Sequence, residues 1–321
     1  MVRIVKKRIA WGTSKLLKMY LVEDGADKFS YCIDDFSNAS DIYGLPVKKS
    51  DSLSQEKKGS FQIVIFAVSN KSLQEITLKL NGMGLSYKKD FIYYSDFFYD
   101  DFVRKAENYL NFKLTPKIYR FALSFSLNSQ TLIHTTILGT WLFLELLNYL
   151  NDIKGQIAEV GAFQGGNALC SLNFMTKLNS KQFYIFDSFV GFPELSKNDP
   201  LNFKKGDYDI KTTFNEIVST FSVFPEARVI KGFVPETFSK IPKKEKFSLV
   251  FYDCDLYQPA LDTFEFFWQR IVKGGYLIIH DYETEVGGFA GVKKATNQFF
   301  ADKKVKLSSF FENTMAVIKK P

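Results

Sequence analysis

The sequence predicts an α/β protein with two units, each built on a mainly parallel sheet. Short apolar runs alternate with segments of helical spacing over residues 8–98, and the same alternation returns over residues 155–301. The chain then closes with two apolar runs that are typical of a β-hairpin. A length of 321 residues is sufficient for two cores of ordinary size.

The first hundred residues are expected to form a small Rossmann-like domain. Its strands are predicted at 8–12, 28–35 and 61–69, and its helices at 14–25 and 70–85. A further apolar run covers 88–98, and residues 44–47 predict a turn that leads into a short extended piece. The turn "WGTSK" at 11–15 contains Gly12 but lacks the second and third glycines of a dinucleotide fingerprint. This argues against a nicotinamide-dependent oxidoreductase that uses the first domain.

The layout of this region, with "WG", "IDD", "GLPV" and "IVIFAVS" in order, resembles the small nucleotide-binding-like domain that precedes some bacterial sugar-modifying acyltransferases. The resemblance leaves two roles open, a structural or docking domain and a domain that binds a nucleotide-sugar. Residues 101–150 then predict a helical connection. Its most apolar part, "ILGTWLFLELLNYL" at 137–150, contains Glu145 and is too short to span a membrane, so we expect a buried amphipathic helix.

Composition restricts the function classes. The net charge is +7, but only six of the 42 basic residues are Arg and they form no cluster, which argues against nucleic-acid binding. Three scattered cysteines do not make a disulfide framework, and a cytoplasmic location is the simplest expectation. The start "MVRIVKKRIAWG" lacks the apolar core of a signal peptide.

Residues 151–321 predict the second domain. Its five strands are expected within 157–160, 181–187, 227–238, 247–253 and 274–281, its helices within 211–222, 235–240, 258–271 and 289–301, and its terminal hairpin within 305–320. Four of the five strand ends carry an acid, namely Glu159, Asp187, Asp253 and Asp281. Ligands of open α/β sheets bind beyond these ends, so we expect the site there.

The turn "EVGAFQGG" follows the first of these strands. It carries Gly161, Gly165 and Gly166, with Glu159 before the first glycine. A carboxylate at this place disfavours a pyrophosphate, whereas the ammonium group of S-adenosylmethionine tolerates it. Asp187 lies 26 residues beyond Gly161 and is placed to bind two ribose hydroxyls.

Residues 130–320 resemble the macrocin O-methyltransferase (TylF-like) family of class I S-adenosylmethionine-dependent methyltransferases. The stretches that carry the resemblance are "AEVGAFQGGNA", "IFDSFVGFPE", "KKGDYDIKTTFNEI", "VIKGFVPETF", "YDCDLYQPALDTFEFFWQRIVKGGYLIIHDY" and "GVKKATNQFF". The resemblance implies a Rossmann-like class I methyltransferase domain, a parallel sheet that ends in an antiparallel hairpin. It also implies which residues bind the cofactor: Glu159, Gly161, Gly165 and Asp187 at its methionine and ribose parts, Ser188 and Phe189 beside the adenosine, and Gly232 and Phe233 beside the adenine.

The family also implies a divalent metal, Mg²⁺ or Mn²⁺, held by the first Asp of a D-x-D motif and by an Asp-Asp pair. The matching positions here are Asp253, His280 and Asp281, so a histidine stands where the family has an aspartate. Imidazole weakens a magnesium site. Two catalytic routes therefore stay open: a metal that lowers the pKa of the acceptor hydroxyl, or His280 as general base beside a carboxylate. The other histidine, His134, is interpreted as a partly buried residue at a helix entry.

The resulting prediction is an S-adenosylmethionine-dependent O-methyltransferase that acts on a sugar hydroxyl of a glycan, nucleotide-sugar or glycosylated metabolite. The resemblance of the first domain favours surface polysaccharide biosynthesis, by analogy alone. The alternative is a non-catalytic nucleotide-sugar-binding protein that retains the fold. We expect a small-molecule or glycan substrate, no nucleic-acid partner and no transmembrane segment; a homo-oligomer stays open. The glycine-rich loop at 286–291 is expected to fold over the acceptor.

Overall fold

The computed structural model describes residues 6–175, 181–210, 214–282, 290–310 and 314–321. The chain forms two compact units, Met1–Arg104 and Lys105–Pro321, and each is described by itself. In the described residues no helix is long and apolar enough to cross a membrane. The division into 1–100, 101–150 and 151–321 stays a prediction about independently folding parts.

The first unit is a six-stranded, mainly parallel sheet with the order β3-β4-β2-β1-β5-β6. Its elements are β1 (Lys7–Trp11), α1 (Lys15–Asp24), β2 (Tyr31–Ile33), β3 (Asp41–Ile42), β4 (Leu45–Lys48), η1 (Ser50–Gln55), β5 (Phe61–Ile65), α2 (Asn70–Gly82), β6 (Phe91–Tyr93) and α3 (Tyr94–Phe97). Among the strand pairs of residues 6–104, only β3–β4 is antiparallel. The predicted strand–helix alternation is therefore found, and "GLPV" begins within the β3–β4 turn and enters β4.

Three helices follow: α4 (Tyr99–Leu110), α5 (Pro116–Asn128) and α6 (Ile137–Tyr149). The helical connection is thus present, but α6 is not amphipathic as expected, because it is buried on nearly all sides. Glu145 is tolerated inside it because its Oε1 accepts hydrogen bonds from Trp141 Nε1 (2.8 Å) and from the Thr115 backbone N–H just before α5.

The second unit contains a seven-stranded sheet with the order β12-β13-β11-β10-β7-β8-β9. Its remaining elements are β7 (Gln156–Val160), α7 (Gly166–Met175), β8 (Phe183–Asp187), α8 (Phe214–Phe221), β9 (Ala227–Lys231), η2 (Glu236–Lys240), β10 (Phe247–Tyr252), α9 (Tyr257–Trp268), β11 (Ile271–His280), α10 (Ala290–Phe300), β12 (Leu307–Phe310) and β13 (Met315–Lys319). Strands β7 to β11 are parallel, and β13 runs antiparallel to both β11 and β12. This is the predicted parallel sheet with a terminal antiparallel hairpin.

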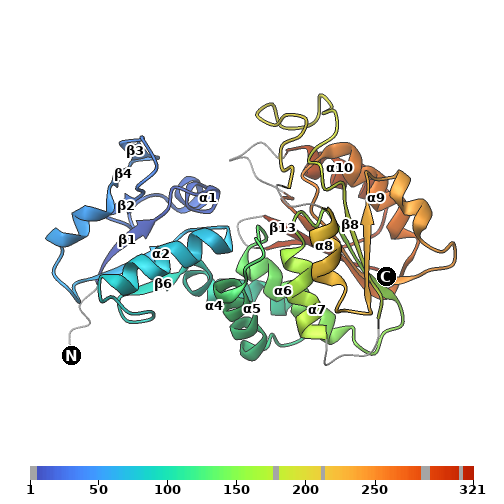
Figure 1. Ribbon diagram of the computed structural model, residues 1–321, viewed down its shortest axis with the longest axis horizontal. Helices are drawn as coiled ribbons and strands as arrows, with labels where there is room; N and C mark the ends of the chain where they lie inside the picture. Colours follow the sequence, from blue (N-terminus) through green and yellow to red (C-terminus); the bar gives the residue numbers. More distant parts are fainter. Residues whose placement is uncertain (1–5, 176–180, 211–213, 283–289, 311–313) are drawn as a thin grey trace. The chain divides into compact units, whose positions relative to one another are not determined.

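The two faces of this sheet are covered by different helices. Phe143 of α6 contacts Phe183 and Phe251, whereas Phe267 of α9 contacts Phe186. Figure 1 shows the corresponding three layers, with α6 and α7 on one side of the sheet and α9 and α10 on the other. Side chains two residues apart share a face, so Glu159, Asp187 and His280 lie on the α6/α7 face together with Phe183 and Phe251.

Candidate functional site

The carboxyl ends of four adjacent strands form one edge of the second unit. Backbone hydrogen bonds tie the residues that follow them together: Gly161 N–H donates to Phe186 O (2.9 Å), Asp253 N–H to Val160 O (2.8 Å) and Gly232 N–H to Asp187 O (2.9 Å). The acids predicted at separate strand ends are therefore close in space. Their charges act on one another, since Asp187 and Asp253 both raise the pKa of Glu159.

Gly161 is required by a close approach of two backbones. A Cβ at this position would lie 2.2 Å from the carbonyl oxygen of Asp253, and the residue has φ +94°. Gly165, with φ +80°, leaves room for the ring of Phe221, to which an added Cβ would come within 2.6 Å. These glycines let the β7–α7 turn pass tightly against the neighbouring strand end.

Glu159 is buried beneath this turn, with 1% of its surface exposed. Its Oε1 accepts a hydrogen bond from Asn167 Nδ2 (3.0 Å) in the first turn of α7. Its Oε2 is buried and has no hydrogen-bond partner among the described residues, and neither has Asn167 Oδ1. Burial raises the pKa of Glu159 to about 8, so the carboxyl is stabilised as an anion only when a cation approaches it.

Asp187 ends β8. Its two carboxylate oxygens accept hydrogen bonds from the backbone N–H groups of Phe163 and Phe189, both at 2.7 Å. Burial nevertheless raises its pKa to about 6. Each oxygen keeps a further lone pair, so a bond to ribose hydroxyls is compatible with these contacts.

The other predicted cofactor residues adjoin this acid. Phe189 is buried with φ +55°, while Ser188 Oγ donates to Gly191 O (2.7 Å) and shapes the loop after β8. Gly232 has φ +133° after β9, and Phe233 is 40% exposed. No contact in the structure assigns Ser188, Phe189, Gly232 or Phe233 to a cofactor part, and their roles stay predictions.

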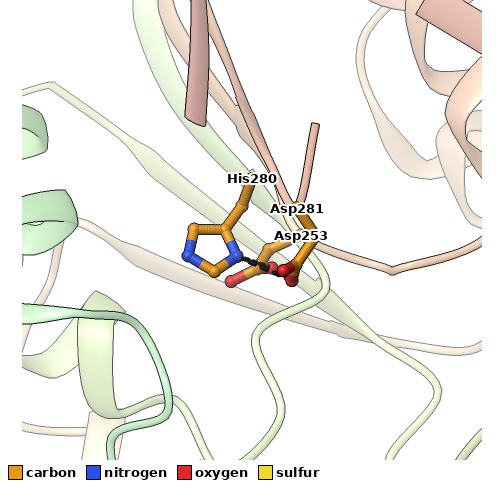
Figure 2. A group of neighbouring side chains, drawn as sticks. All are labelled: Asp253, His280 and Asp281. Carbon is orange, nitrogen blue, oxygen red and sulfur yellow. Dashed lines mark hydrogen bonds and ion pairs between the residues drawn. The ribbon is translucent and has the colours of Figure 1, made fainter. Parts of the chain in front are cut away.

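Asp253, His280 and Asp281 form a compact triad, as Figure 2 shows. His280 Nδ1 lies 2.9 Å from Asp253 Oδ1 and 2.9 Å from Asp281 Oδ2, and all three side chains are at most 17% exposed. Burial acts to lower the pKa of His280, but the two carboxylates and their hydrogen bonds outweigh it and raise the pKa well above its ordinary value. The imidazole thus supplies positive charge to two buried anions.

The second ring nitrogen of His280 points away from both carboxylates (Figure 2). This Nε2 is buried and has no hydrogen-bond partner in the described part of the chain. A neutral imidazole that keeps its Nδ1 proton toward the carboxylates would accept a proton at Nε2. The same three side chains also each offer one ligand atom within 4.8 Å of the others, which fits a single divalent cation.

The structure adds residues that the sequence reasoning missed. Asn167 contacts Glu159, and Thr135 Oγ1 lies 3.5 Å from Asp253 Oδ2 as a weak donor. Asn167 could have been found from its place in the helix turn after the glycines, but nothing in the sequence connects Thr135 with a residue 118 positions later. His134 does precede a helix, α6, as expected, but it is exposed and lies beside the ring of Phe163 rather than partly buried.

Comparisons with known proteins find methyltransferases that are similar to this chain. The chain is 22% identical to a mycinamicin III 3''-O-methyltransferase of Micromonospora griseorubida over 46% of this chain and 67% of that enzyme. It is 21% identical to the 8-demethyl-8-(2,3-dimethoxy-alpha-L-rhamnosyl)-tetracenomycin-C 4'-O-methyltransferase of Streptomyces olivaceus over 41% of this chain and 54% of that enzyme, so the match spans about half of the latter. The crystal structure of a calicheamicin methyltransferase superposes with a TM-score of 0.51 at 16% identity, covering 68% of this chain and 91% of that one.

The structural likeness identifies the fold of the second unit as that of class I methyltransferases. A family model gives the more specific result, because residues 146–317, more than half of the chain, match the macrocin-O-methyltransferase (TylF) family. The match begins inside α6 and ends within β13, so it includes the glycine turn, Asp187 and the whole triad. The chain therefore belongs to the macrocin O-methyltransferase family, whose members methylate oxygen with S-adenosylmethionine.

Proposed function

We propose that the second unit transfers the methyl group of S-adenosylmethionine to a sugar hydroxyl. The observation that carries the proposal is found at one sheet edge. Among the described residues, a buried Glu159 oxygen and His280 Nε2 of the triad both lie there without a hydrogen-bond partner. The first fits the ammonium group of the cofactor, and the second fits a hydroxyl that must lose its proton. The two relatives named above carry methyltransferase names, one of which contains a rhamnosyl group.

The residues present fit the cofactor. Glu159 Oε2 and Asn167 Oδ1 are buried acceptors with no partner among the described residues. Both would accept hydrogen bonds from the ammonium group of the cofactor's amino-acid part. Gly161 and Gly165 keep the turn above them free of side chains. Asp187 would bind the ribose hydroxyls with the lone pairs that its backbone contacts leave over.

In the reaction, the sulfonium of the cofactor supplies an activated methyl group. The chain must then align the acceptor oxygen and take its proton. We assign the proton to His280 Nε2, with Asp253 and Asp281 holding Nδ1 and stabilising the imidazolium that results. Because the pKa of His280 lies well above its ordinary value, the neutral, proton-accepting form becomes more populated as the pH rises, and turnover should rise with it.

The alternative role of the triad is to hold a divalent cation, Mg²⁺ or Mn²⁺. Asp253, His280 and Asp281 would supply one ligand atom each, and such a cation would lower the pKa of the acceptor hydroxyl. The cation would replace the imidazole proton as the positive charge between the carboxylates. Binding would therefore release a proton from His280.

The proposal is tested with radiolabelled S-adenosylmethionine and a panel of pyranosides, free and nucleotide-linked, with EDTA or with Mg²⁺. His280→Asp separates the two roles: it loses turnover in either condition if His280 is the base, and it stays active and becomes Mg²⁺-dependent if the triad binds metal.

Calorimetry with S-adenosylhomocysteine tests the cofactor site. Asp187→Ala should weaken binding by about 1.5–3 kcal/mol, the scale of hydrogen bonds to a charged group. Equal affinity for the wild type and this variant would remove the ribose assignment.

A role in surface polysaccharide biosynthesis follows from the resemblance of residues 1–100 to a domain of sugar-modifying enzymes, and a non-catalytic sugar-binding role would require that the assay find no methyl transfer. For the first unit, the same proposal leaves two roles, docking and nucleotide-sugar binding. It also includes a cytoplasmic location and leaves a homo-oligomer open. The loop predicted to fold over the acceptor lies mostly outside the described residues, which resume at Ala290.

A further inference from the structure

Three aromatic side chains cluster beside the triad, and the proposed chemistry uses none of them. The ring centroids of His134 and Phe163 are 5.0 Å apart, those of His134 and Tyr208 6.3 Å, and those of Phe163 and Tyr208 6.1 Å. The corresponding interplanar angles are 89°, 79° and 85°. We call these residues the aromatic trio. Because its rings are mutually near-perpendicular, no two of them form a parallel-walled slot.

The trio adjoins residues of both the cofactor site and the triad. Phe163 belongs to the glycine turn, and its backbone N–H donates to Asp187 Oδ2. His134 precedes Thr135, whose hydroxyl lies near Asp253. Burial first, and then the carboxylates of Asp255, Asp281 and Asp253, raise the pKa of Tyr208, so its hydroxyl lies within reach of the charges of two triad residues. The three rings are thus neighbours of residues proposed to bind the cofactor and of residues proposed to activate the acceptor.

These rings are also accessible to a ligand. His134 is exposed and Tyr208 is 43% exposed, although both are large and carry ring surface that a core would bury. Tyr208 is nevertheless held in place, because it packs on Phe192 and Phe203 at centroid distances of 5.1 and 6.0 Å. Backbone hydrogen bonds from Phe192 N–H to Asp207 O and from Gly206 N–H to Phe192 O close the loop that carries it.

Backbone strain marks the same region. Eight described non-glycine residues have a left-handed backbone, and five of them follow the strand ends or belong to the trio: Phe163, Phe189, Tyr208, Asp255 and Asp281. Conformations of this kind cost of order 1–3 kcal/mol each and persist where the surrounding structure enforces them, often at ligand sites. The positions of the Phe163 and Tyr208 rings are therefore maintained against a local cost.

We propose that the aromatic trio binds one face of the acceptor's pyranose ring and thereby selects the sugar whose hydroxyl is presented to His280. A pyranose chair offers apolar C–H groups on its faces, which pack on aromatic rings, and hydroxyls at its rim, which donate to carboxylates. This inference rests on the proposed function and names the part of the site that decides its acceptor.

The surroundings distinguish this ligand from two others. A planar aromatic acceptor would be held best between parallel rings, and the perpendicular trio provides no such pair. A phosphate next to the triad would meet the carboxylates of Asp253, Asp255 and Asp281, whose charges reach Tyr208. An uncharged, chair-shaped ring rich in hydrogen-bond donors meets neither obstacle.

The experiment uses the full chain and two pairs of variants. Tyr208→Leu and His134→Leu remove a ring, whereas Tyr208→Phe and His134→Phe keep one. Tyr149→Leu is the matched control, because Tyr149 has the same 43% exposure but ends α6, away from the strand ends. Thermal melting and calorimetry with S-adenosylhomocysteine establish that each variant is folded and binds cofactor product like the wild type. Initial rates are then measured with methyl pyranosides, nucleotide-linked pyranosides and catechol.

With the best pyranoside, each Leu variant should raise KM roughly tenfold with kcat within about threefold, because the ring contributes to binding before and during the reaction. The Phe variants and Tyr149→Leu should stay within about threefold of the wild-type KM. Leu variants whose KM stays within about twofold on a pyranoside that the wild type methylates would overturn the inference and leave the proposed function standing. A wild type that binds S-adenosylhomocysteine yet methylates catechol alone, or no pyranoside at all, would reject both.

Discussion

The acid after β2 and the acid that ends β8 hold the same place in their two sheets, but their surroundings are opposite. Asp34 accepts from Thr13 N–H (2.9 Å), Thr13 Oγ1 (2.6 Å), and the N–H groups of Phe36 and Ser37 (both 2.9 Å). Partial burial would raise its pKa, but these bonds outweigh it and hold the pKa below its ordinary range. The carboxylate of Asp187 accepts hydrogen bonds from the backbone N–H groups of Phe163 and Phe189, and its pKa is raised to about 6.

The difference between Asp34 and Asp187 indicates which features of a sheet edge favour ligand binding. Both units place a positive-φ glycine after the first strand, Gly12 at φ +104° and Gly161 at φ +94°. In the first unit the acid is used to hold its own loops, and the buried oxygen without a described partner at that edge, Ser14 Oγ, is neutral. In the second unit, Glu159 Oε2 and His280 Nε2 have no hydrogen-bond partner among the described residues, and a ligand would satisfy them.

The largest expected effect tests whether the second edge alone is catalytic. Asp281→Asn keeps the shape of the triad but removes a charge that faces His280, so turnover should fall by a factor on the order of 10²–10⁴. Cofactor affinity should hardly change, because its recognised groups lie at β7 and β8. Asp34→Asn is the counterpart in the first unit and should leave turnover within about threefold, an expectation from its saturated contacts. An equal loss in both variants would break the comparison.

The two glycines sharpen the comparison through stability. A Cβ at Gly161 would lie 2.2 Å from Asp253 O, whereas at Gly12 it would lie 3.0 Å from Phe66 O. Both alanines would adopt an unfavourable φ, but only Gly161→Ala must also displace a neighbouring strand end. We expect losses in unfolding free energy of about 3–5 kcal/mol for Gly161→Ala and about 1–3 kcal/mol for Gly12→Ala. Chemical denaturation measures both, and the reverse ranking would contradict the packing argument.

Glu159 gives a smaller effect with a defined pH dependence. Its pKa in the folded, unliganded protein is raised to about 8 by burial, so at pH 6.5 it is mostly protonated. An ammonium ligand favours the carboxylate, so binding releases this proton and affinity should increase with pH. Between pH 6.5 and 7.5 the increase for S-adenosylhomocysteine should be roughly five- to tenfold. Glu159→Gln should bind more weakly and lose this slope, and a variant that keeps the slope would place the titrating group elsewhere.

The same raised pKa has a consequence for stability. A carboxyl that binds its proton more tightly when folded favours the folded state at low pH, and this contribution is lost as the pH rises from the ordinary value of 4.5 toward about 8. Cofactor binding opposes the loss. The unliganded wild type should therefore lose stability across this range relative to Glu159→Gln, and calorimetric unfolding with and without S-adenosylhomocysteine measures the difference.

Both sheets and the position of the strand-end acids could be predicted from the sequence, because they depend on hydrophobic periodicity and on residues at the ends of strands. The alternation of apolar strands with helices, the glycine after each first strand and the acids at strand ends gave both sheets and placed Glu159, Asp187, Asp253 and Asp281 on one edge. The parallel arrangement makes this possible, since it brings all strand carboxyl ends together. The roles of the triad residues, in contrast, were implied by the family resemblance.

What the sequence could not give depends on packing. The burial of α6 on nearly all sides follows from α5 and α7 lying against it, and Glu145 is tolerated only through its contacts with Trp141 and Thr115. The ring contact of His134 with Tyr208 joins two segments about seventy residues apart. Neither pattern nor propensity records such pairs, because they arise from side chains of distant segments.

The smallest expected effect tests whether the two units differ in function as sharply as their edges do. The compact units divide after Arg104, but α4 runs from Tyr99 to Leu110, so a chain that starts at residue 99 keeps this helix whole. Tyr109 anchors it, since its hydroxyl is within hydrogen-bonding distance of Lys306 O (2.8 Å) and Val317 O (2.9 Å) in the second unit. All the proposed cofactor residues lie beyond residue 155. The truncated chain should therefore bind S-adenosylhomocysteine within about threefold of the full-length affinity. A change of this size in binding free energy is smaller than the loss of one hydrogen bond to a charged group. Calorimetry on both chains gives the ratio, and cooperative melting shows that the shorter one is folded. A folded truncation that no longer binds would mean that the first unit takes part in the cofactor site, and the contrast between Asp34 and Asp187 would then describe two parts of one site.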